Sequence, residues 1–285
     1  MNILKKNDIK FPKRLLQIDN PPKQLYAKGD IELLNNDCIA IVGTRKCTPY
    51  GEKYASKFAK ELSKQGICIV SGLATGIDSI AHIHSMEEKG KTIAVLGSGF
   101  NHIYPRENQY LYEKILENGG CVIAEYPPET QKNKENFPQR NRIVSGLSIG
   151  VLIIEARYYT GTSITARYAI KQRKPVFCIP HSLDESTGYT PNWFIQHGSE
   201  LVMEPQDILN YYHEEDIGEN KEESGVLEKY KEVYDLIGQL PISINEISKK
   251  LKINISQISE GLCMLELEGY ITNLPGNLYI RKEKN

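Results

Sequence analysis

The sequence predicts an α/β protein with a Rossmann-like, doubly wound and mostly parallel sheet, followed by a small winged-helix domain. From residue 38 to about residue 204, short β-branched runs that end in glycine or another small residue alternate with segments of helical character. These runs are apolar throughout, which is typical of strands buried on both faces of a parallel sheet. After residue 226 the order is helix, helix, helix and hairpin, which predicts the winged helix.

The elements of the large domain follow in a regular order. Its strands are expected at CIAIVG (38–43), ICIVSG (67–72), TIAVLG (92–97), CVIAEY (121–126), IGVLIIEA (149–156), PVFCIP (175–180) and SELVME (199–204). The first helix should begin at Pro49, a favoured first-turn position for proline, and end before Gly66. The other helices are expected at 77–89, 106–118, 138–147, 163–173 and 191–197. A ligand of such a sheet should lie at the carboxyl ends of its strands.

The chain divides into four parts. Residues 1–37, which contain PPKQLYAKGD, are expected to form an extended N-terminal cap on the Rossmann-like domain at 38–212. Residues 213–225 are expected to form an acidic linker, because HEEDIGENKEES holds six acidic residues and one lysine. The winged helix should occupy 226–285, with its hairpin turn at Pro275-Gly276-Asn277.

Composition narrows the range of functions. The 285 residues are 40% hydrophobic and 25% charged, and the formal net charge is −1. Any contact with nucleic acid must therefore come from a local group of cations. The six cysteines form no CxxC pair and four lie in apolar runs, so we expect free thiols and no metal site. No signal-peptide core and no membrane-length apolar run is present, which predicts a cytoplasmic protein without membrane contact.

Small residues and hydroxyls follow several of the expected strands. They occur as Gly43-Thr44-Arg45, Ser71-Gly72, Gly97-Ser98-Gly99 and Gly161-Thr162-Ser163. Each group precedes a helix, whose first backbone N–H groups favour an anion. A single glycine there can simply make a tight turn, but four such loops on one edge of a sheet indicate an anion site. No loop matches the dinucleotide or Walker fingerprint, so a phosphate in another context is expected.

The stretch FPQRNRIVSGLS places Arg140 and Arg142 in one turn, ahead of an apolar run. Arginine suits bidentate phosphate contact, and Phe137, with Tyr158-Tyr159 further along, offers flat surfaces for bases. The competing interpretation puts Phe137 in the core and pairs an arginine with a carboxylate such as Glu125 or Glu155. The sequence leaves open which arginine contacts a ligand and which is structural.

Five motifs together resemble the DNA-processing protein A family, also called Smf. They are GTRKCTPYG, IVSGLATGIDSIAH, TIAVLGSG, FPQRNRIVSGLS and TGTSITARYA, in this order over about residues 20–204. The tail at 226–282 resembles the winged-helix domain that many members carry. The resemblance implies a non-enzymatic homodimer that protects incoming single-stranded DNA and loads RecA recombinase onto it in natural transformation or recombination. Some members carry an N-terminal helical domain, for which we expect no counterpart in this sequence.

The resemblance also implies the positions of the DNA contacts. Mapped residue by residue, the single-stranded DNA site comprises Gly43, Thr44, Arg45, Ser71, Gly72, Lys134, Phe137, Arg140, Asn141, Arg142, Gly161, Thr162 and Ser163. Dimerisation is implied for the Rossmann-like domain. Residues 175–212 carry aromatic residues that suit an interface, although Trp193 also suits an ordinary core.

An enzyme is the main alternative function. Phosphoribohydrolases of the same broad superfamily carry PGGxGTxxE with a catalytic glutamate, whereas YYTGTSITA here has Thr165 at that position. Asp78 is typical of a residue at a helix start, and His82 and His84 do not share a helix face. We therefore expect no catalysis and no cofactor.

A winged-helix transcription regulator is the second alternative. The helix expected at 255–269 would be its DNA reader, yet it contains no lysine or arginine and carries Glu260, Glu266 and Glu268. Its apolar residues Ile255, Ile258, Leu262, Met264 and Leu265 are expected to face the core. We therefore predict a protein-interaction or regulatory module at 226–285 rather than a sequence-specific duplex reader.

Overall fold

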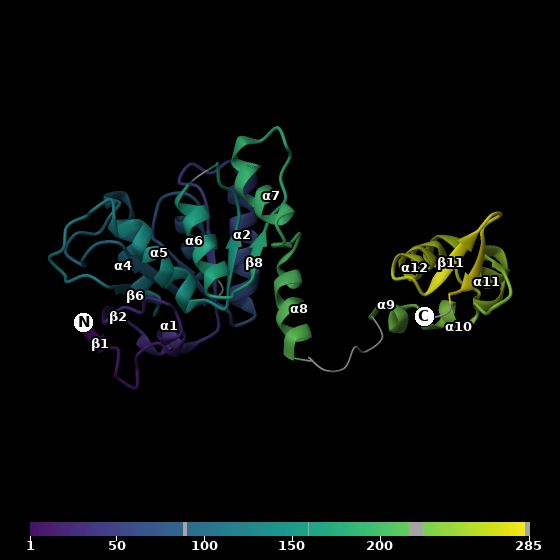
Figure 1. Cartoon of the computed structure of the whole chain (residues 1–285), viewed down its shortest axis with the longest axis horizontal. Helices are drawn as coiled ribbons and strands as arrows, with labels where there is room; N and C mark the ends of the chain where they lie inside the picture. The colour runs from purple at the N-terminus through teal and green to yellow at the C-terminus, as the bar shows by residue number, and fades with distance from the viewer. Residues whose placement is uncertain (88–89, 159, 217–224, 283–285) are drawn as a thin grey trace. The chain divides into compact units, whose positions relative to one another are not determined.

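The structure is a computed structural model that describes residues 1–87, 90–158, 160–216 and 225–282. The chain forms two compact units, Met1–Tyr211 and Tyr212–Asn285 (Figure 1). The first unit contains the sheet and the second contains a small bundle of helices with a hairpin, so each is described by itself.

In the described part of the first unit, nine strands form one sheet in the order β1-β2-β6-β5-β4-β3-β7-β8-β9. The strands are β1 Asn2–Lys5, β2 Gln24–Gly29, β3 Cys38–Val42, β4 Cys68–Ser71, β5 Thr92–Leu96, β6 Cys121–Ala124, β7 Gly150–Ile153, β8 Val176–Cys178 and β9 Glu200–Leu201. Strands β3 to β9 pair in parallel, whereas β1 and β2 pair antiparallel at one edge. The predicted doubly wound, mostly parallel sheet is confirmed.

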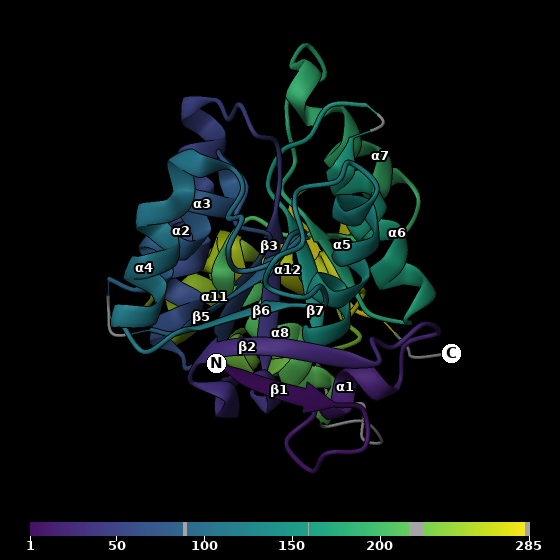
Figure 2. The same cartoon turned by 90° about the vertical axis from the view of Figure 1, so that its left-hand side faces the viewer.

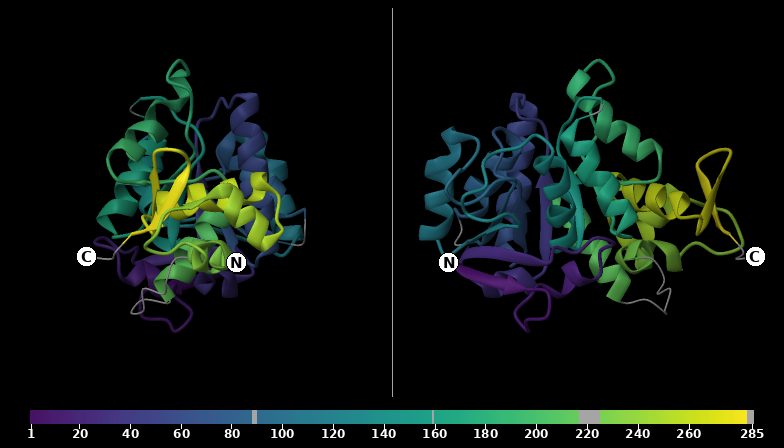
Figure 3. Two further views of the ribbon diagram at one scale, coloured as in Figure 1. Left: turned by 90° about the vertical axis from the view of Figure 1, so that its right-hand side faces the viewer. Right: turned by 60° about the vertical axis from the view of Figure 1, so that its left-hand side comes forward.

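Helices cover both faces of this sheet. They are α1 Lys13–Leu16, α2 Pro49–Lys64, α3 Ile77–Ser85, α4 Gln109–Glu117, α5 Asn136–Leu147, α6 Gly161–Lys171, α7 Tyr189–Gln196 and α8 Pro205–Asp216, with short 3-10 helices at Ile31–Asn35, Arg106–Asn108 and Ser186–Gly188. Helices α2, α3 and α4 lie on one side of the strands, and α5, α6 and α7 lie on the other (Figures 2 and 3). Alternate residues of β3 follow this division, since Cys38, Ala40 and Val42 pack with Ile143 of α5.

Residues 1–37, expected as an extended cap, instead add two strands to the sheet. Strand β2 pairs antiparallel with β6, with Ala27 opposite Ile123, and β1 pairs with β2. Leu4 and Leu25 are buried and join the main core. The prediction treated this segment as polar and missed the two strands. Each strand buries only one face, so apolar residues alternate with polar ones along it.

The strand order places a topological switch point at β3. The chain runs from β3 outward through β4 and β5 to β6, and α5 then carries it back to β7, on the other side of β3. In open α/β sheets ligands bind at the carboxyl ends of the strands beside such a point. Helices α5 and α6 also begin two residues earlier than expected, at Asn136 and Gly161, so both reach this edge.

The second unit is a winged helix, as predicted. Its elements are α9 Gly225–Lys229, α10 Lys231–Asp235, β10 Ile242–Ser243, α11 Ile244–Leu251, α12 Ile255–Leu267, β11 Ile271–Leu274 and β12 Leu278–Arg281. A capping box between Ser243 and Glu246 starts α11, and a β10-β12-β11 sheet forms the wing. The acidic linker expected at 213–225 overlaps α8 as far as Asp216, and residues 217–224 lie outside the described residues.

Two expectations for the winged helix are wrong. Ile255 and Met264 of α12 were expected in the core, but they are 46% and 36% exposed. Ile258, Leu262 and Leu265 lie on the single buried face of α12 and fill the small core with Ile247 of α11. The apolar residues of α12 cover a wider arc of the helix than the small core can bury, so Ile255 and Met264, at the edges of this arc, remain exposed.

Candidate nucleic-acid interface

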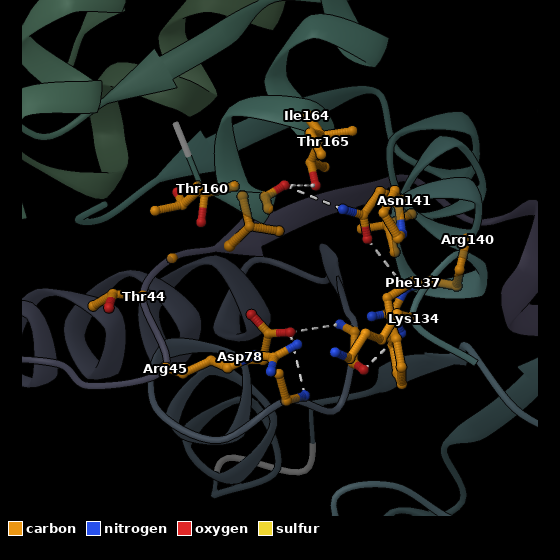
Figure 4. A pocket seen from close by; sticks show the side chains of 18 of the residues that line it. Thr44, Arg45, Asp78, Lys134, Phe137, Arg140, Asn141, Thr160, Ile164 and Thr165 are labelled. Atoms are coloured by element: carbon orange, nitrogen blue, oxygen red, sulfur yellow. Dashed lines mark hydrogen bonds between the residues drawn. The ribbon is translucent and has the colours of Figure 1, made fainter. Parts of the chain in front are cut away.

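A cavity of about 930 Å³ opens at the carboxyl edge of the sheet, beside the switch point. Its walls come from the segments that follow β3, β4, β5, β6 and β7, which are neighbours in the sheet. Figure 4 shows Thr44, Arg45 and Asp78 on one side of the cavity and Lys134, Phe137, Arg140 and Asn141 on the other. Thr160, Ile164 and Thr165, at the start of α6, close a third side.

The segment after β3 is held close to the start of α3. A side chain at Gly43 would place its Cβ 2.5 Å from Ile77 Cγ1, so only glycine fits there. Gly76 has a φ of +76°, and an added Cβ would lie 2.4 Å from the carbonyl oxygen of Thr44. This tight packing fixes the backbone that carries Arg45. The Arg45 side chain is exposed, lines the cavity and makes no hydrogen bond or ion pair to any described residue.

Helical geometry separates the two arginines of α5. Phe137, Arg140, Asn141 and Val144 all line the cavity, at the i, i+3, i+4, i+7 spacing of one helix face. Arg142 lies about 200° around the helix from Arg140 and therefore points elsewhere. Helix geometry therefore answers the question that the sequence left open. Arg140 faces the cavity, and Arg142 faces other parts of the protein.

Arg142 forms an ion pair within the protein. Its Nη2 lies 2.6 Å from Glu125 Oε1, just beyond β6, and both side chains are largely buried. Arg142 does not line the cavity. Glu125 is therefore the partner of Arg142, while Glu155 accepts hydrogen bonds from the backbone N–H and the hydroxyl of Thr48 at 2.7 and 2.9 Å.

Arg140 is buried, but part of its guanidinium group faces the cavity. Nη1 donates to the carbonyl oxygens of Gly72, at 2.6 Å, and Val95, and Nε donates to Asn141 Oδ1 at 3.2 Å. Within the described residues, Nη2 makes no hydrogen bond, so its two N–H groups are available to a ligand. Burial lowers the pKa of Arg140 to about 10, which leaves the side chain charged at neutral pH.

Asp78 lies on the floor of the cavity and supports the loop after β4. Its Oδ2 accepts hydrogen bonds from the backbone N–H groups of Gly72 and Ala74, at 3.2 and 3.3 Å. Burial raises the pKa of Asp78, and the charge of Arg140 together with these hydrogen bonds opposes that rise. A methyl group at Gly72 would lie 2.6 Å from Arg140 Nη2 and 2.8 Å from Asp78 Oδ2, so this glycine admits both side chains.

The start of α6 contributes backbone rather than charge. Gly161 and Thr162 line the cavity, and among the described residues no atom beyond the adjacent chain and helix backbone lies within 4 Å of the position that a Gly161 Cβ would take. Asn141 Nδ2 donates to the carbonyl oxygen of Gly161 at 3.1 Å, which ties α5 to α6. Ser163 instead turns its hydroxyl to the Thr160 carbonyl oxygen, at 2.6 Å.

The cavity unites ten of the thirteen residues that the sequence singled out, and the other three have bonds inside the fold. Those three are Ser71, whose hydroxyl donates to Ile41 O at 2.7 Å, together with Arg142 and Ser163. The sequence missed Tyr104 and Lys132, which come from segments after β5 and β6. Lys132 stands two residues before Lys134, so the charge pattern KNKENF was a signal for it. Tyr159, considered for base contact, lies outside the described residues.

The charges around the cavity are predominantly positive. Arg45, Lys132, Lys134 and Arg140 line it, against the single buried carboxyl of Asp78. Thr165, at the position where a phosphoribohydrolase needs glutamate, also lines it. Across the described residues, no cluster of histidine, cysteine, aspartate or glutamate has the form of a metal site. None of the helices in the described ranges combines the length and apolar character that a membrane span requires.

Comparison with known proteins gives concordant matches for both units. The family DNA recombination-mediator protein A matches residues 2–213, and the DprA winged helix domain matches residues 222–277. Protein Smf of Escherichia coli (strain K12) is 34% identical over 280 residues, which cover 95% of this chain and 75% of that protein. DNA processing protein DprA of Bacillus subtilis (strain 168) is 41% identical over 208 residues, which cover 73% of this chain and 70% of that protein.

Solved structures agree with these sequence matches. DNA processing protein A from Streptococcus pneumoniae has a TM-score of 0.70 at 37% identity, and the match covers 73% of each chain. DNA processing protein A from Helicobacter pylori has a TM-score of 0.67 at 32% identity, covering 75% of this chain and 97% of that one. The work on the Helicobacter pylori protein concerns its unique single-stranded DNA binding mode.

Proposed function

The chain belongs to the DNA recombination-mediator protein A family, and from that premise we propose that it binds single-stranded DNA in the cavity beside the β3 switch point. The observation that carries the proposal is the excess of cations there. Arg45 and Lys134 are exposed and have no partner among the described residues, and Arg140 presents its free Nη2. In a chain of net charge −1, such a concentration of unpaired cations is the local feature that a polyanion requires.

Each wall of the cavity has a distinct part in this proposal. Arg45, Lys132 and Lys134 contact phosphates from solvent-exposed positions, whereas Arg140 is preorganised and gives directional hydrogen bonds. The first backbone N–H groups of α6, at Gly161 and Thr162, donate hydrogen bonds to a further phosphate oxygen.

The aromatic ring of Phe137 provides the base contact. It is half-buried at the start of α5, and a side chain at Gly97 would lie 2.7 Å from the ring, so the glycine makes room for it. Stacking tolerates every base, which predicts binding without marked sequence preference. In a duplex the base faces are already stacked, so a duplex cannot use this ring without unpairing. Single strands are therefore preferred.

A homodimer and delivery of the strand to RecA recombinase extend the proposal. Around the edge strand β9, Trp193, Leu201 and Met203 are 37%, 47% and 69% exposed, which suits contact with a second copy of the chain. Two linked cavities would raise the affinity for a long strand through effective concentration.

We expect Leu201→Lys to shift full-length protein to monomer in light scattering. An unchanged dimer would argue against this face.

The role of the bound complex is measured with RecA itself. We expect the protein to increase RecA-dependent ATP hydrolysis on single strands coated with single-strand binding protein. Arg45→Ala should lose this stimulation, because the protein would no longer hold the strand. No stimulation by wild-type protein that binds DNA normally would contradict recombinase loading while leaving DNA binding intact.

Fluorescence anisotropy of a labelled single strand tests the binding site directly. Arg45→Ala should weaken binding and lower the slope of log affinity against log salt by about 0.7, the loss of one single-strand phosphate contact. Lys46→Ala is the matched control, since Lys46 is the adjacent exposed cation and does not line the cavity. Equal effects of the two substitutions would contradict the site.

A further inference from the structure

We propose a second subsite for single-stranded DNA, in which the strand passes from the main cavity across Tyr104 and contacts Arg106, Lys132 and His102. The inference rests on the proposed function and names where the strand continues after it fills the main cavity. Its basis is a row of adjoining cavities, the position of one ring between them, and unpaired cations at the far end.

Two smaller cavities adjoin the main one. A cavity of about 210 Å³ shares Arg45, Phe137 and Arg140 with the main cavity and adds Thr75 and Pro105. A third cavity of about 440 Å³, the far cavity, shares Tyr104 and Lys132 with the main one. It is lined by His102, Ile103, Tyr104, Arg106, Glu107, Gln131 and Lys132. Among the described residues, Tyr104 is the one that lines all three. A chain of nucleotides that enters the main cavity therefore has a continuous path past this ring.

The Tyr104 ring continues the aromatic surface that Phe137 begins. The two ring centroids are 5.6 Å apart with an interplanar angle of 52°, and Lys132 Nζ lies 4.4 Å from the Tyr104 centroid. A half-exposed ring next to a lysine offers base contact and phosphate contact at one place. The lysine stem is flexible, so a phosphate can draw the ammonium off the ring as a base stacks on it.

The far cavity is positively charged and its cations are unpaired. Arg106 and Lys132 are exposed and form no ion pair with any described residue, and His102 is exposed beside them. Glu107 is the one acidic residue of the lining. Exposed cations without acidic partners keep their full attraction for a phosphate, because no internal ion pair has to break first.

The walls of the far cavity are fixed to one another before any ligand arrives. Gly99 N donates to Thr130 O at 2.8 Å, and Asn101 N donates to Pro128 O at 2.9 Å, which joins the loop after β5 to the loop after β6. A side chain at Gly99 would place its Cβ 2.1 Å from Pro127 O, so this glycine permits the close approach. The two loops that carry Arg106 and Lys132 are therefore preorganised, which lowers the entropy cost of binding.

The test compares oligonucleotides of different length with full-length protein in anisotropy titrations. Arg106→Ala, which alters the far cavity and leaves the main one intact, should lower the affinity for a long oligothymidylate and reduce its salt slope by about 0.7. The affinity for an oligonucleotide too short to leave the main cavity should not change. Lys114→Ala is the control, because Lys114 is an exposed cation of α4 outside all three cavities.

The ring is tested separately. Tyr104→Ala should cost roughly fivefold to a hundredfold in affinity for the long strand, the range for loss of one stacked base, and Tyr104→Phe should restore most of it. If Arg106→Ala and Tyr104→Ala both bind long strands as wild type does, while Arg45→Ala is impaired, the subsite is overturned and the main site stands. If Arg45→Ala also binds normally, the proposed function falls and the subsite falls with it.

Discussion

The cavity of the first unit lies where α/β sheets commonly bind ligands, and helix α12 of the second unit lies where helix-turn-helix modules contact DNA, yet their charges are opposite. Four cations and one buried carboxyl line the cavity. Helix α12, the helix that enters the major groove in a helix-turn-helix module, carries no lysine or arginine. Its exposed surface bears Glu260 and Glu266 beside Cys263, Met264 and Leu267.

This difference shows that fold type alone does not decide which surface of a protein carries the positive charge that a polyanion requires. A net charge of −1 conceals both surfaces, because it averages a cation-rich cavity with an acidic helix. The cavity suits a phosphate chain, and the exposed apolar and acidic face of α12 suits a protein partner. The following predictions test this division, beginning with the largest expected effect.

Matched charge reversals in the two units should have unequal effects. Arg45→Glu with Lys134→Glu should lower single-strand affinity at least about a hundredfold, since two phosphate contacts are lost and repulsion replaces them. Lys249→Glu with Lys250→Glu makes the same change in charge on exposed residues of α11 and should alter affinity little. Anisotropy titrations at one salt concentration measure both. Similar losses of affinity in the two double variants would contradict the assignment of binding to the cavity.

The first unit should lose stability in mild acid. Thr92 Oγ1 donates to Ile69 O, so His82 Nδ1 donates to Thr92 Oγ1. The buried Nε2 of His82 has no hydrogen-bond partner in the described part of the chain. Burial, with the charge of Arg140, lowers the pKa of His82 to about 3. The unfolded chain takes up this proton below about pH 6.5 and the folded chain does not, so stability falls as pH falls from 6.5 towards 3.

The expected slope is at most about 1.4 kcal/mol per pH unit from this residue. Urea unfolding followed between pH 7 and 5 measures it, with His82→Gln as the variant that removes the titrating group. The described residues of the winged helix, 225–282, contain no histidine, so its unfolding should lack this dependence. An equal slope in wild type and His82→Gln would exclude His82 as the cause.

Adding one methyl group to a glycine in each unit should affect single-strand binding only in the first unit. Among the described residues, no atom beyond the adjacent chain and helix backbone lies within 4 Å of the Cβ position of Gly161 or Gly238. Neither glycine has a positive φ, so alanine fits both. Gly161→Ala should leave the melting temperature unchanged or raise it, and weaken single-strand binding roughly threefold to tenfold by blocking a phosphate at α6. Gly238→Ala, in the winged helix, should leave binding unchanged. Full affinity in Gly161→Ala would mean that the strand does not approach this backbone.

The smallest effect is expected from the winged helix itself. Residues 226–285, prepared alone, should bind duplex DNA no more tightly than non-specific proteins do, with dissociation constants of about 10⁻⁴ M or weaker at physiological salt, because α12 presents glutamates to the polyanion. Circular dichroism checks that the fragment is folded. Tight, sequence-dependent binding would instead support a transcription regulator.

The sequence predicts features that depend on neighbouring residues and misses those that depend on distant ones. Strands such as β3 were predictable because burial on both faces makes every residue apolar. Strand β2 was missed because only alternate residues, Leu25 and Ala27, are buried. Helix phase explains why Arg140 and Arg142 point in different directions, but the partner of Arg142, Glu125, follows β6 and could only be offered as a candidate. Tyr104 reaches the site because two distant loops meet at Gly99.

Photocrosslinking with full-length protein tests the central claim most directly. A single strand substituted with iododeoxyuridine is irradiated in complex with the protein, and the attached peptides are identified by mass spectrometry. We expect attachment at Phe137 or Tyr104, the aromatic side chains of the cavity, and loss of attachment in Arg45→Glu with Lys134→Glu. Attachment concentrated in residues 225–282, or unchanged by the double substitution, would contradict it.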